Sequence, residues 1–360
     1  MQTIDLLWWG SDLPSWALGD ACSLPADLPG AAEQLAAVAA STGAPWLLLW
    51  DPGRPLPEPA LLAELTGGRA DAWHAGLAGG LLGVPEEHDY LDPLWPLGHD
   101  AGADVEAVSW RIDLGTLLVR AEAVRTLGSL DLAFEGRTGA GLELGRRLID
   151  RGAVVCHAPR LVAAGRLPVE PIAEPDRFAL LQRTFPPAWA RYAAARRALA
   201  HPHPRRMAAA LRTATARTAT RPRPSGSGPV LARPAVPLPP DPSISVVVST
   251  SGRSEAVART LAGLADQTIV PTQVVIQAGG IRDPHPDGFD AFGPAFSLEV
   301  LHPDGRGPTS SRNEAVRRTT GEWIAFVGEG CELAPDLLER HLDGLVRYQA
   351  DLTTGAAPSP

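Results

Sequence analysis

The run from Ile244 to Val248 restricts the fold of this chain more than any other feature. Four of its five residues are β-branched, which is typical of a strand buried on both faces of a parallel sheet. The run breaks at the polar stretch 249–252, and a helix with Ser254 as its N-cap is predicted over residues 254–265. A strand that leads through a short turn into a helix opens a βαβ unit, so we expect a parallel sheet from this point onward.

Alternating strand and helix patterns extend over most of the chain. After residue 265 the sequence predicts strands at 273–276 and 323–327 and helices at 309–318 and 335–348. Before residue 168 it predicts strands at 4–9, 46–50, 114–119 and 153–156 and helices at 29–41, 59–65, 121–127 and 142–151. We therefore expect an α/β protein of two units, each with a mixed, mostly parallel sheet flanked by helices.

The stretch between the two units is strongly basic. Between Asp176 and Asp241 the sequence contains 12 Arg and no acidic residue, although the formal net charge of the chain is −9. Two helices rich in Ala and Arg are expected over 188–200 and 206–218, followed by a Pro-rich extended linker over 221–243. The expected organisation is a first unit, a helical segment with a linker, and a second unit, at residues 1–168, 169–242 and 243–360.

The basic stretch has two interpretations. It can be a solvated linker, or its Arg side chains can contact an anionic membrane surface. Nucleic acid is not an expected partner, because the chain as a whole is acidic and no stacking aromatic residues interleave the Arg.

The expected location is the cytoplasm, with membrane association left open. The three Cys lie far apart in the sequence, so neither a disulfide framework nor a zinc site is expected. The N-terminal residues lack the basic segment of a signal peptide, and no apolar run reaches the ~18–20 residues that span a bilayer.

Two stretches of the second unit bear a family resemblance. ISVVVSTSGRSEAVARTLAGLADQT resembles the opening strand, turn and helix of glycosyltransferase family 2. PTSSRNEAVRRTTGEWIAFVGEGCELAPDLLERHL resembles the helix, turn and strand that lead to the metal motif of that family. The resemblance covers about residues 243–356 and is most specific at Arg312-Asn313 and at 320–326. It implies the Rossmann-like glycosyltransferase-A (GT-A) fold, which binds nucleotide-diphospho-sugars.

The first unit resembles the later part of the same family. WLLLWDPGRPLPEPALLAEL is similar to the strand, metal motif and following helix, and GTLLVRAEAVRTLGSLDLAFEG is similar to the acceptor-side strand and the segment after it. The resemblance implies two divergent GT-A units in tandem. The second ends at Pro360, before any acceptor-side half. Either the sequence is a piece of a longer protein, or the two halves act together.

The candidate binding residues follow the ends of the predicted strands. Ligands of parallel sheets bind beyond the carboxyl ends of the strands, and a helix N-terminus there suits a diphosphate. The resemblance implies that the nucleotide-sugar contacts Ser249, Thr250, Arg253, Gln277, Arg312 and Asn313. The alternative for Asn313 is a structural hydrogen bond, and the alternative for Arg253 is an ordinary exposed cation.

This chain keeps only part of the acidic motifs of the family. Its Asp-x-Asp motif, which holds Mg²⁺ or Mn²⁺, corresponds to Gly328-Glu329-Gly330 in the second unit and to Asp51-Pro52-Gly53 in the first. Glu329 and Asp51 are therefore the candidate metal ligands. The alternatives are a solvated loop carboxylate for Glu329 and the cap of a strand-to-turn corner for Asp51. Ala140-Gly141 stand where the family has its general base, so no catalytic residue is assigned.

The resemblance to family 2, together with the positions at which this chain differs from that family, leads to two candidate functions. The first is transfer of a sugar from a nucleotide-sugar donor to a polysaccharide, lipid or protein acceptor, with Mg²⁺ or Mn²⁺ as the cofactor. The alternative is a catalytically inactive glycosyltransferase-like scaffold or regulatory partner, because each metal motif keeps only one carboxylate and no acidic residue stands in the place of the general base.

Overall fold

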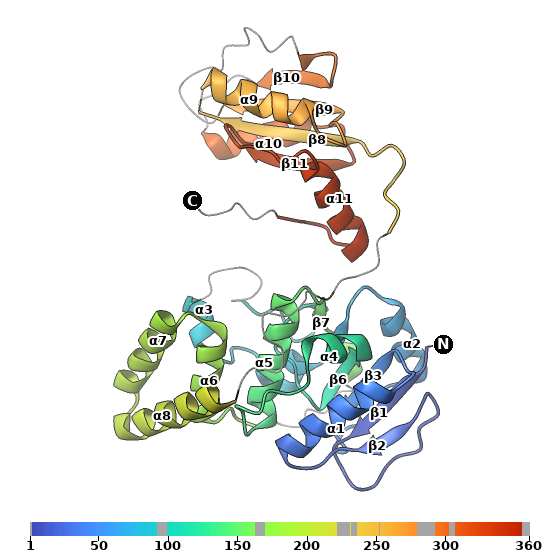
Figure 1. The fold of residues 1–360 in the computed structure, drawn as a ribbon, viewed down its shortest axis with the longest axis vertical. Helices are drawn as coiled ribbons and strands as arrows, with labels where there is room; N and C mark the ends of the chain where they lie inside the picture. The colour runs from blue at the N-terminus through green and yellow to red at the C-terminus, as the bar shows by residue number, and fades with distance from the viewer. Residues whose placement is uncertain are drawn as a thin grey trace. The chain divides into compact units, whose positions relative to one another are not determined.

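The computed structural model describes residues 2–91, 99–162, 170–221, 231, 236–251, 253–278, 292–301 and 307–354. The chain divides into two compact units, Met1–Ala232 and Arg233–Pro360, which are described separately below (Figure 1). Most of the Pro-rich linker expected over 221–243 lies outside the described residues.

Unit 1 contains a seven-stranded sheet in the order β2-β1-β3-β6-β4-β7-β5. β1 is parallel to β2 and β3, and β4 is parallel to β7, whereas β6 is antiparallel to both β3 and β4 and β5 is antiparallel to β7. The sheet is therefore mixed, with most strands running in one direction. The strands are β1 (Ile4–Trp8), β2 (Ala21–Ser23), β3 (Trp46–Trp50), β4 (Ala72–His74), β5 (Ala107–Val108), β6 (Thr116–Arg120) and β7 (Val155–His157).

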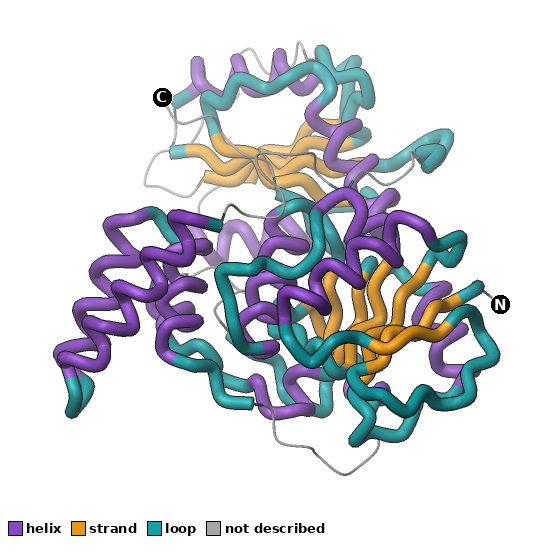
Figure 2. The backbone as a smooth tube through the Cα atoms, turned by 60° about the horizontal axis from the view of Figure 1, so that its bottom comes forward, coloured by secondary structure: helices purple, strands orange, loops and turns teal. Residues whose placement is uncertain are grey.

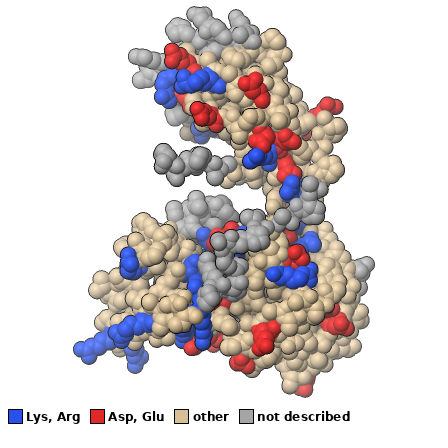
Figure 3. Space-filling view, in the orientation of Figure 1, with Lys and Arg blue, Asp and Glu red and all other residues tan. Residues whose placement is uncertain are grey.

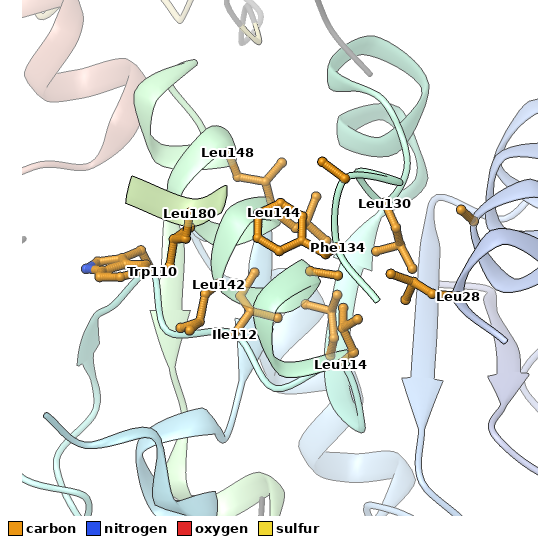
Figure 4. Packing of buried hydrophobic residues seen from close by; sticks show 14 of the residues in the cluster. Leu28, Trp110, Ile112, Leu114, Leu130, Phe134, Leu142, Leu144, Leu148 and Leu180 are labelled. Carbon is orange, nitrogen blue, oxygen red and sulfur yellow. The ribbon is translucent and has the colours of Figure 1, made fainter. Parts of the chain in front are cut away.

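Alternating side chains of β3 build two cores, one on each face of this sheet. Leu47 and Leu49 join a cluster that includes side chains of α1 (Leu28–Ser41), α4 (Ala121–Leu127) and α5 (Arg137–Asp150). Figure 4 shows members of this cluster, and Figure 2 shows helices lying against the strands of the sheet. Trp46, Leu48 and Trp50 join a second cluster with α2 (Pro59–Gly67). Because both faces of β3 are covered, its sequence is apolar throughout rather than alternating. The remaining short elements are α3 (Glu87–Leu91), η1 (Leu77–Leu81) and η2 (Pro159–Leu161).

Three helices of the basic stretch pack onto unit 1. They are α6 (Glu174–Thr184), α7 (Pro187–Ala200) and α8 (Pro204–Thr220). Phe178 and Leu180 of α6 belong to the same core as α5, and Ala193 of α7 and Met207 of α8 are buried there too. The helical part of the basic stretch is therefore attached to the first unit by a shared core.

Several Arg of the basic stretch form ion pairs with acidic residues of unit 1. The nitrogen–oxygen distances are 2.9 Å for Arg177–Glu87, 2.8 Å for Arg183–Asp131 and 3.0 Å for Arg217–Asp176. The basic stretch itself contains no acidic residue. Two of the partners, Glu87 and Asp131, lie earlier in the chain, and the third, Asp176, directly precedes the stretch. These Arg therefore stabilise the docking of α6 and α8.

Unit 2 contains a four-stranded sheet in the order β10-β9-β8-β11, in which all strands are parallel. Side chains of α9 (Ser254–Ala265) and α11 (Leu337–Tyr348) cover one face, and Ala315 of α10 (Pro308–Arg318) packs against the other face. The strands are β8 (Ile244–Thr250), β9 (Gln273–Ala278), β10 (Ser297–Leu301) and β11 (Trp323–Gly328).

The structure confirms the expected fold class, a mostly parallel mixed α/β arrangement with flanking helices. Several local expectations differ from it, two of them in unit 2. Arg253 rather than Ser254 is the N-cap of α9, and its side chain makes no capping hydrogen bond. β10 was not predicted, because Ser297–Leu301 lies at the edge of the sheet and is only half-buried, so its sequence has no continuous apolar run. Within the described segments, no helix is both long and apolar enough to cross a membrane.

Candidate functional site

The carboxyl ends of three strands in unit 2 meet at one edge of the sheet. Ser249 of β8 is in register with Gly328 of β11 on one side and with Gln277 of β9 on the other. At the opposite edge, the carbonyl of Arg318 at the end of α10 accepts a hydrogen bond from Gln273 at the start of β9. α10 therefore begins at the carboxyl edge, as α9 does.

Three residues surround the carboxylate of Glu329, directly after β11. Thr250 Oγ1 donates to Oε2, Ser251 Oγ donates to Oε1 at 2.5 Å, and Arg253 Nε and Nη2 each lie 2.8 Å from Oε1. The backbone N–H of Ser251 also donates to this carboxylate. We call Thr250, Ser251, Arg253 and Glu329 the Glu329 cluster.

The Glu329 cluster keeps its carboxylate ionised. Burial acts to raise the pKa of Glu329, but hydrogen bonds from Ser251, Thr250 and Arg253 outweigh it and lower the pKa to about 2. Since this pKa is below the ordinary value of 4.5, the contribution of the carboxylate to stability is present above pH 4.5. It is lost as the pH falls through about 2. Glu329 is thus a permanent anion in neutral solution.

A second polar pair lies on the other face of the same edge. Gln277 Nε2 donates to Ser249 Oγ at 2.7 Å. These side chains continue the alternation of Val247 and Val275, which face α10, whereas Thr250 continues the alternation that faces α9. Gln277 is 1% exposed, and its Oε1 has no hydrogen-bond partner among the described residues. A buried acceptor of this kind is satisfied when a ligand donates an N–H or O–H to it.

Arg312 and Asn313 lie in the amino-terminal half of α10, and both are exposed. No hydrogen bond of either side chain to another described residue is present. The structure therefore brings Thr250, Arg253 and Glu329 into contact on one face of this edge, and Ser249 and Gln277 into contact on the other. It places Arg312 and Asn313 on the helix that begins there, without joining them to the Glu329 cluster.

Asp51 lies after the central strand of unit 1. Its Oδ1 accepts a hydrogen bond of 3.0 Å from the backbone N–H of Gly53, which closes the corner after β3. Its Oδ2 lies 3.3 Å from Nη1 of Arg137, the first residue of α5. Arg137 also lies over the ring of Trp9, with its guanidinium carbon 5.0 Å from the ring centroid. In unit 1, as in unit 2, a carboxylate that directly follows a strand is paired with an Arg at the start of a helix.

The residues of these sites do not fit Mg²⁺ or Mn²⁺. Mg²⁺ takes six oxygen ligands in octahedral geometry, among them carboxylates with free lone pairs. Glu329 receives donors from Thr250, from the side chain and backbone of Ser251, and from Arg253, and a carboxylate has only about four lone-pair sites. In the part of the chain that the structure describes, no group of three or more His, Cys, Asp and Glu could hold a metal ion.

Sequence reasoning missed two members of these sites. Ser251 was recognised only as part of the break after β8, although a Ser-Thr-Ser run at a strand end signals several hydroxyl donors. Arg137 carried no signal, since it pairs with a residue 86 positions away in the sequence.

Comparison with known proteins gives a family match for the second unit. The sequence model of the family described as glycosyl transferase family 2 matches residues 245–360. The second unit is therefore similar to glycosyltransferase family 2 over nearly its whole length. The Glu329 cluster, Ser249, Gln277, Arg312 and Asn313 all lie within the matched residues.

One curated relative is EpsH of Bacillus subtilis (strain 168), which is named as a glycosyltransferase. It is 26% identical over 102 residues, which make up 28% of this chain and 30% of EpsH. The chain thus spans less than a third of the length of this relative.

Two solved structures share limited similarity with the chain. S. aureus TarS is 21% identical, with a TM-score of 0.26, over 29% of this chain and 19% of TarS. The mannosyltransferase PcManGT from Pyrobaculum calidifontis, solved in complex with GDP-Man and Mn²⁺, is 23% identical, with a TM-score of 0.27. That match covers 34% of this chain and 37% of PcManGT.

Proposed function

We propose that the chain binds a nucleoside-diphosphate sugar at the carboxyl edge of unit 2 and takes part in transferring the sugar to a glycan or lipid-linked acceptor. The observation that carries this proposal is the set of polar side chains at the carboxyl ends of β8, β9 and β11, within a segment that matches family 2. Open parallel sheets bind nucleotides at this edge. The similarity to EpsH, which is named as a glycosyltransferase, supports sugar transfer rather than a scaffold role.

Different residues at this edge bind different parts of the donor. Gln277 and Ser249 offer hydrogen-bonding groups to the nucleoside, since Gln277 Oε1 is a buried acceptor without a partner among the described residues. Thr250, Arg253 and the start of α9 lie beside the place for the diphosphate. Arg312 and Asn313, exposed near the start of α10, contact the phosphates or the sugar from the other side of the sheet.

The reaction follows the chemistry of sugar transfer. The oxygen of an acceptor hydroxyl forms a bond to the anomeric carbon of the sugar, and the bond from that carbon to the phosphate oxygen breaks. The electron pair of the broken bond leaves with the nucleoside diphosphate, and the hydroxyl proton passes to a base.

The first prediction concerns Arg312. We expect the 360-residue chain to bind UDP or GDP in isothermal titration calorimetry, and Arg312→Gln to weaken binding about tenfold. Loss of one charge-assisted contact of ~1.4 kcal/mol corresponds to that factor. Arg317→Gln is the matched control, because Arg317 lies on the same helix near the amino edge of the sheet, paired with Glu314 at 2.8 Å. No binding at millimolar nucleotide, or equal losses in both variants, would contradict the proposed site.

We propose in addition that α7 and α8 contact an anionic membrane surface. Arg191, Arg196, Arg205, Arg206 and Arg212 are exposed, and no ion pair joins them to an acidic residue that the structure describes. Figure 3 shows Arg side chains gathered over this part of unit 1. Trp189 and Tyr192, which lie among these Arg, are 56% and 50% exposed. Exposed aromatic residues beside basic ones are typical of surfaces at a membrane interface.

The second prediction tests this surface by co-sedimentation with vesicles. The chain is expected to bind phosphatidylglycerol–phosphatidylcholine vesicles but not phosphatidylcholine alone, and high salt should release it. Arg205→Gln combined with Arg212→Gln should weaken binding about 30-fold, because each basic residue contributes ~1 kcal/mol at an anionic surface. Arg317→Gln with Arg318→Gln removes the same charge from unit 2 and should have little effect. Unchanged binding of the first double variant would exclude the α7–α8 surface.

A further inference from the structure

The Glu329 cluster contains a cation of its own. Arg253 Nε and Nη2 lie 2.8 Å from Glu329 Oε1, so one edge of the guanidinium is fixed by the carboxylate. Its Nη1 has no hydrogen-bond partner among the described residues, and the Arg253 side chain is 72% exposed, compared with 7% for Glu329. The carboxylate is thus enclosed by the chain, while the other edge of the guanidinium faces outward.

The charge of this pair equals that of the expected metal site. A divalent cation held by two carboxylates has no net charge, and neither has one guanidinium held by one carboxylate. The sequence has lost one carboxylate, at Gly328-Glu329-Gly330, and the structure supplies one positive charge from Arg253 instead of two from an ion. A diphosphate would therefore meet the same net charge at this edge without a metal.

The geometry of a guanidinium suits this task. Its planar array of N–H donors can hold a carboxylate with one edge and phosphate oxygens with another, and its charge does not depend on pH in the range where proteins fold. Glu329 holds the group in one orientation, so less conformational entropy is lost when the phosphate binds. Thr250 and Ser251 complete the support by donating to the same carboxylate.

Unit 1 repeats the arrangement independently. Asp51 follows the central strand of that sheet, and Arg137 at the start of α5 lies 3.3 Å from its Oδ2. The two Arg come from different elements of their units. Arg253 directly precedes α9, the helix after the first strand of unit 2, whereas Arg137 begins α5, which is far from Asp51 in the sequence. In both units, the carboxylate at the position of the metal motif is paired with a guanidinium.

We propose that unit 2 binds the diphosphate of its donor without a divalent cation, and that the Arg253 guanidinium, held by Glu329, takes the place of the ion. This inference rests on the proposed function, since it concerns the same donor. In it Arg253 is a binding residue that touches the phosphate, and Glu329 is a positioning residue that acts through Arg253. This assignment differs from the role of metal ligand that the resemblance implies for Glu329.

The two roles of Glu329 predict different effects of one substitution. Glu329→Gln removes the negative charge and leaves one oxygen to accept from Arg253, while an NH2 group replaces Oε2, the acceptor of Thr250. If Glu329 positions Arg253, this variant should bind UDP or GDP up to about tenfold more weakly, by the same factor in EDTA and in Mn²⁺, because Arg253 is held less firmly. If Glu329 holds a metal, the loss of affinity should occur in Mn²⁺ only.

The experiment combines nucleotide and metal titrations on the complete chain. UDP and GDP are titrated by calorimetry in EDTA and in Mn²⁺, and Mn²⁺ alone is titrated by electron paramagnetic resonance. We expect nucleotide affinities within about twofold in the two buffers, no Mn²⁺ site in the absence of nucleotide, and a loss of about tenfold or more in Arg253→Gln. Arg317→Gln is the matched control for loss of an exposed Arg and should leave the affinity unchanged.

The outcomes separate this inference from the proposed function. Nucleotide binding that requires Mn²⁺, or a stoichiometric Mn²⁺ site that disappears in Glu329→Gln, would overturn the inference and leave the proposed donor in place. An Arg253→Gln variant that binds as well as the unaltered chain would also overturn it. Absence of nucleotide binding in both buffers would contradict the proposed function itself, and the inference would fail with it.

Discussion

Replacing Arg147 by Met is expected to lower the free energy of unfolding of unit 1 by about 3–5 kcal/mol. Arg147 and Glu143 are an ion pair within α5, with a nitrogen–oxygen distance of 3.0 Å and side chains only 2% and 1% exposed. The guanidinium of Arg147 also donates to the carbonyls of Leu127, Gly128 and Ser129. The substitution leaves a buried anion and three carbonyls without this partner, and breaking one side of a buried pair is far costlier than the pair itself is stabilising.

Urea unfolding followed by tryptophan fluorescence measures this effect, because nine of the ten Trp precede residue 232 and the signal reports mainly on unit 1. Arg160→Met is the matched control. Arg160 is paired with Glu64 at 2.7 Å, but their side chains are 50% and 60% exposed, so we expect a change below about 1 kcal/mol. Equal effects of the two substitutions would show that the burial of Arg147 does not determine its contribution. Adding Glu143→Leu to Arg147→Met should restore part of the loss by removing the buried charge.

Gly145→Ala is expected to destabilise unit 1 by about 2–3 kcal/mol, although Ala ordinarily stabilises a helix interior by up to ~1 kcal/mol relative to Gly. A Cβ at Gly145 would lie 1.9 Å from the carbonyl oxygen of Trp110 and 2.8 Å from its carbonyl carbon. These are backbone atoms, and Trp110 is only 1% exposed, so α5 or the 110–112 segment must shift.

The matched control is Gly67→Ala at the end of α2. A Cβ there meets no atom within 4 Å, and we expect a change within about 0.5 kcal/mol. The same urea titration compares the two variants. Stabilisation by Gly145→Ala would mean that α5 does not approach the 110–112 segment as closely as the structure has it.

The close packing of α5 against the 110–112 segment also explains why small residues replace the general base of the family. Ala140-Gly141 stand where the family resemblance places a general base. A Cβ at Gly141 would lie 2.6 Å from the carbonyl oxygen of Ile112, and Ala140 is fully buried. These positions now serve the packing of a helix against a strand-like segment, so a carboxylate side chain would not fit there. Such a use of small residues cannot be recognised without knowing which backbone lies opposite.

The central strands of both sheets were predictable from the sequence alone. Trp46–Trp50 and Ile244–Val248 are apolar at nearly every position, and a strand covered on both faces needs that pattern in any context. The helix over 254–265 has the same extent in the structure as predicted. The short strands β4 and β7 pair with other strands over three residues each, so they carry little periodic signal of their own. β4 was missed, and β7 was expected two residues too early.

The sequence by itself determined that Thr250 and Glu329 follow two strands of one parallel sheet, because strand order and direction follow from the βαβ pattern. Only the tertiary structure decided what these residues do to each other. Thr250, Ser251 and Arg253 converge on one carboxylate from a turn 76–79 residues away. Hydrogen bonds act over about 3 Å, whereas sequence patterns report only the face and the end of an element on which a residue lies. The partner of a charged group is therefore decided by packing, and with it whether Glu329 is free for a metal or already bound to an arginine.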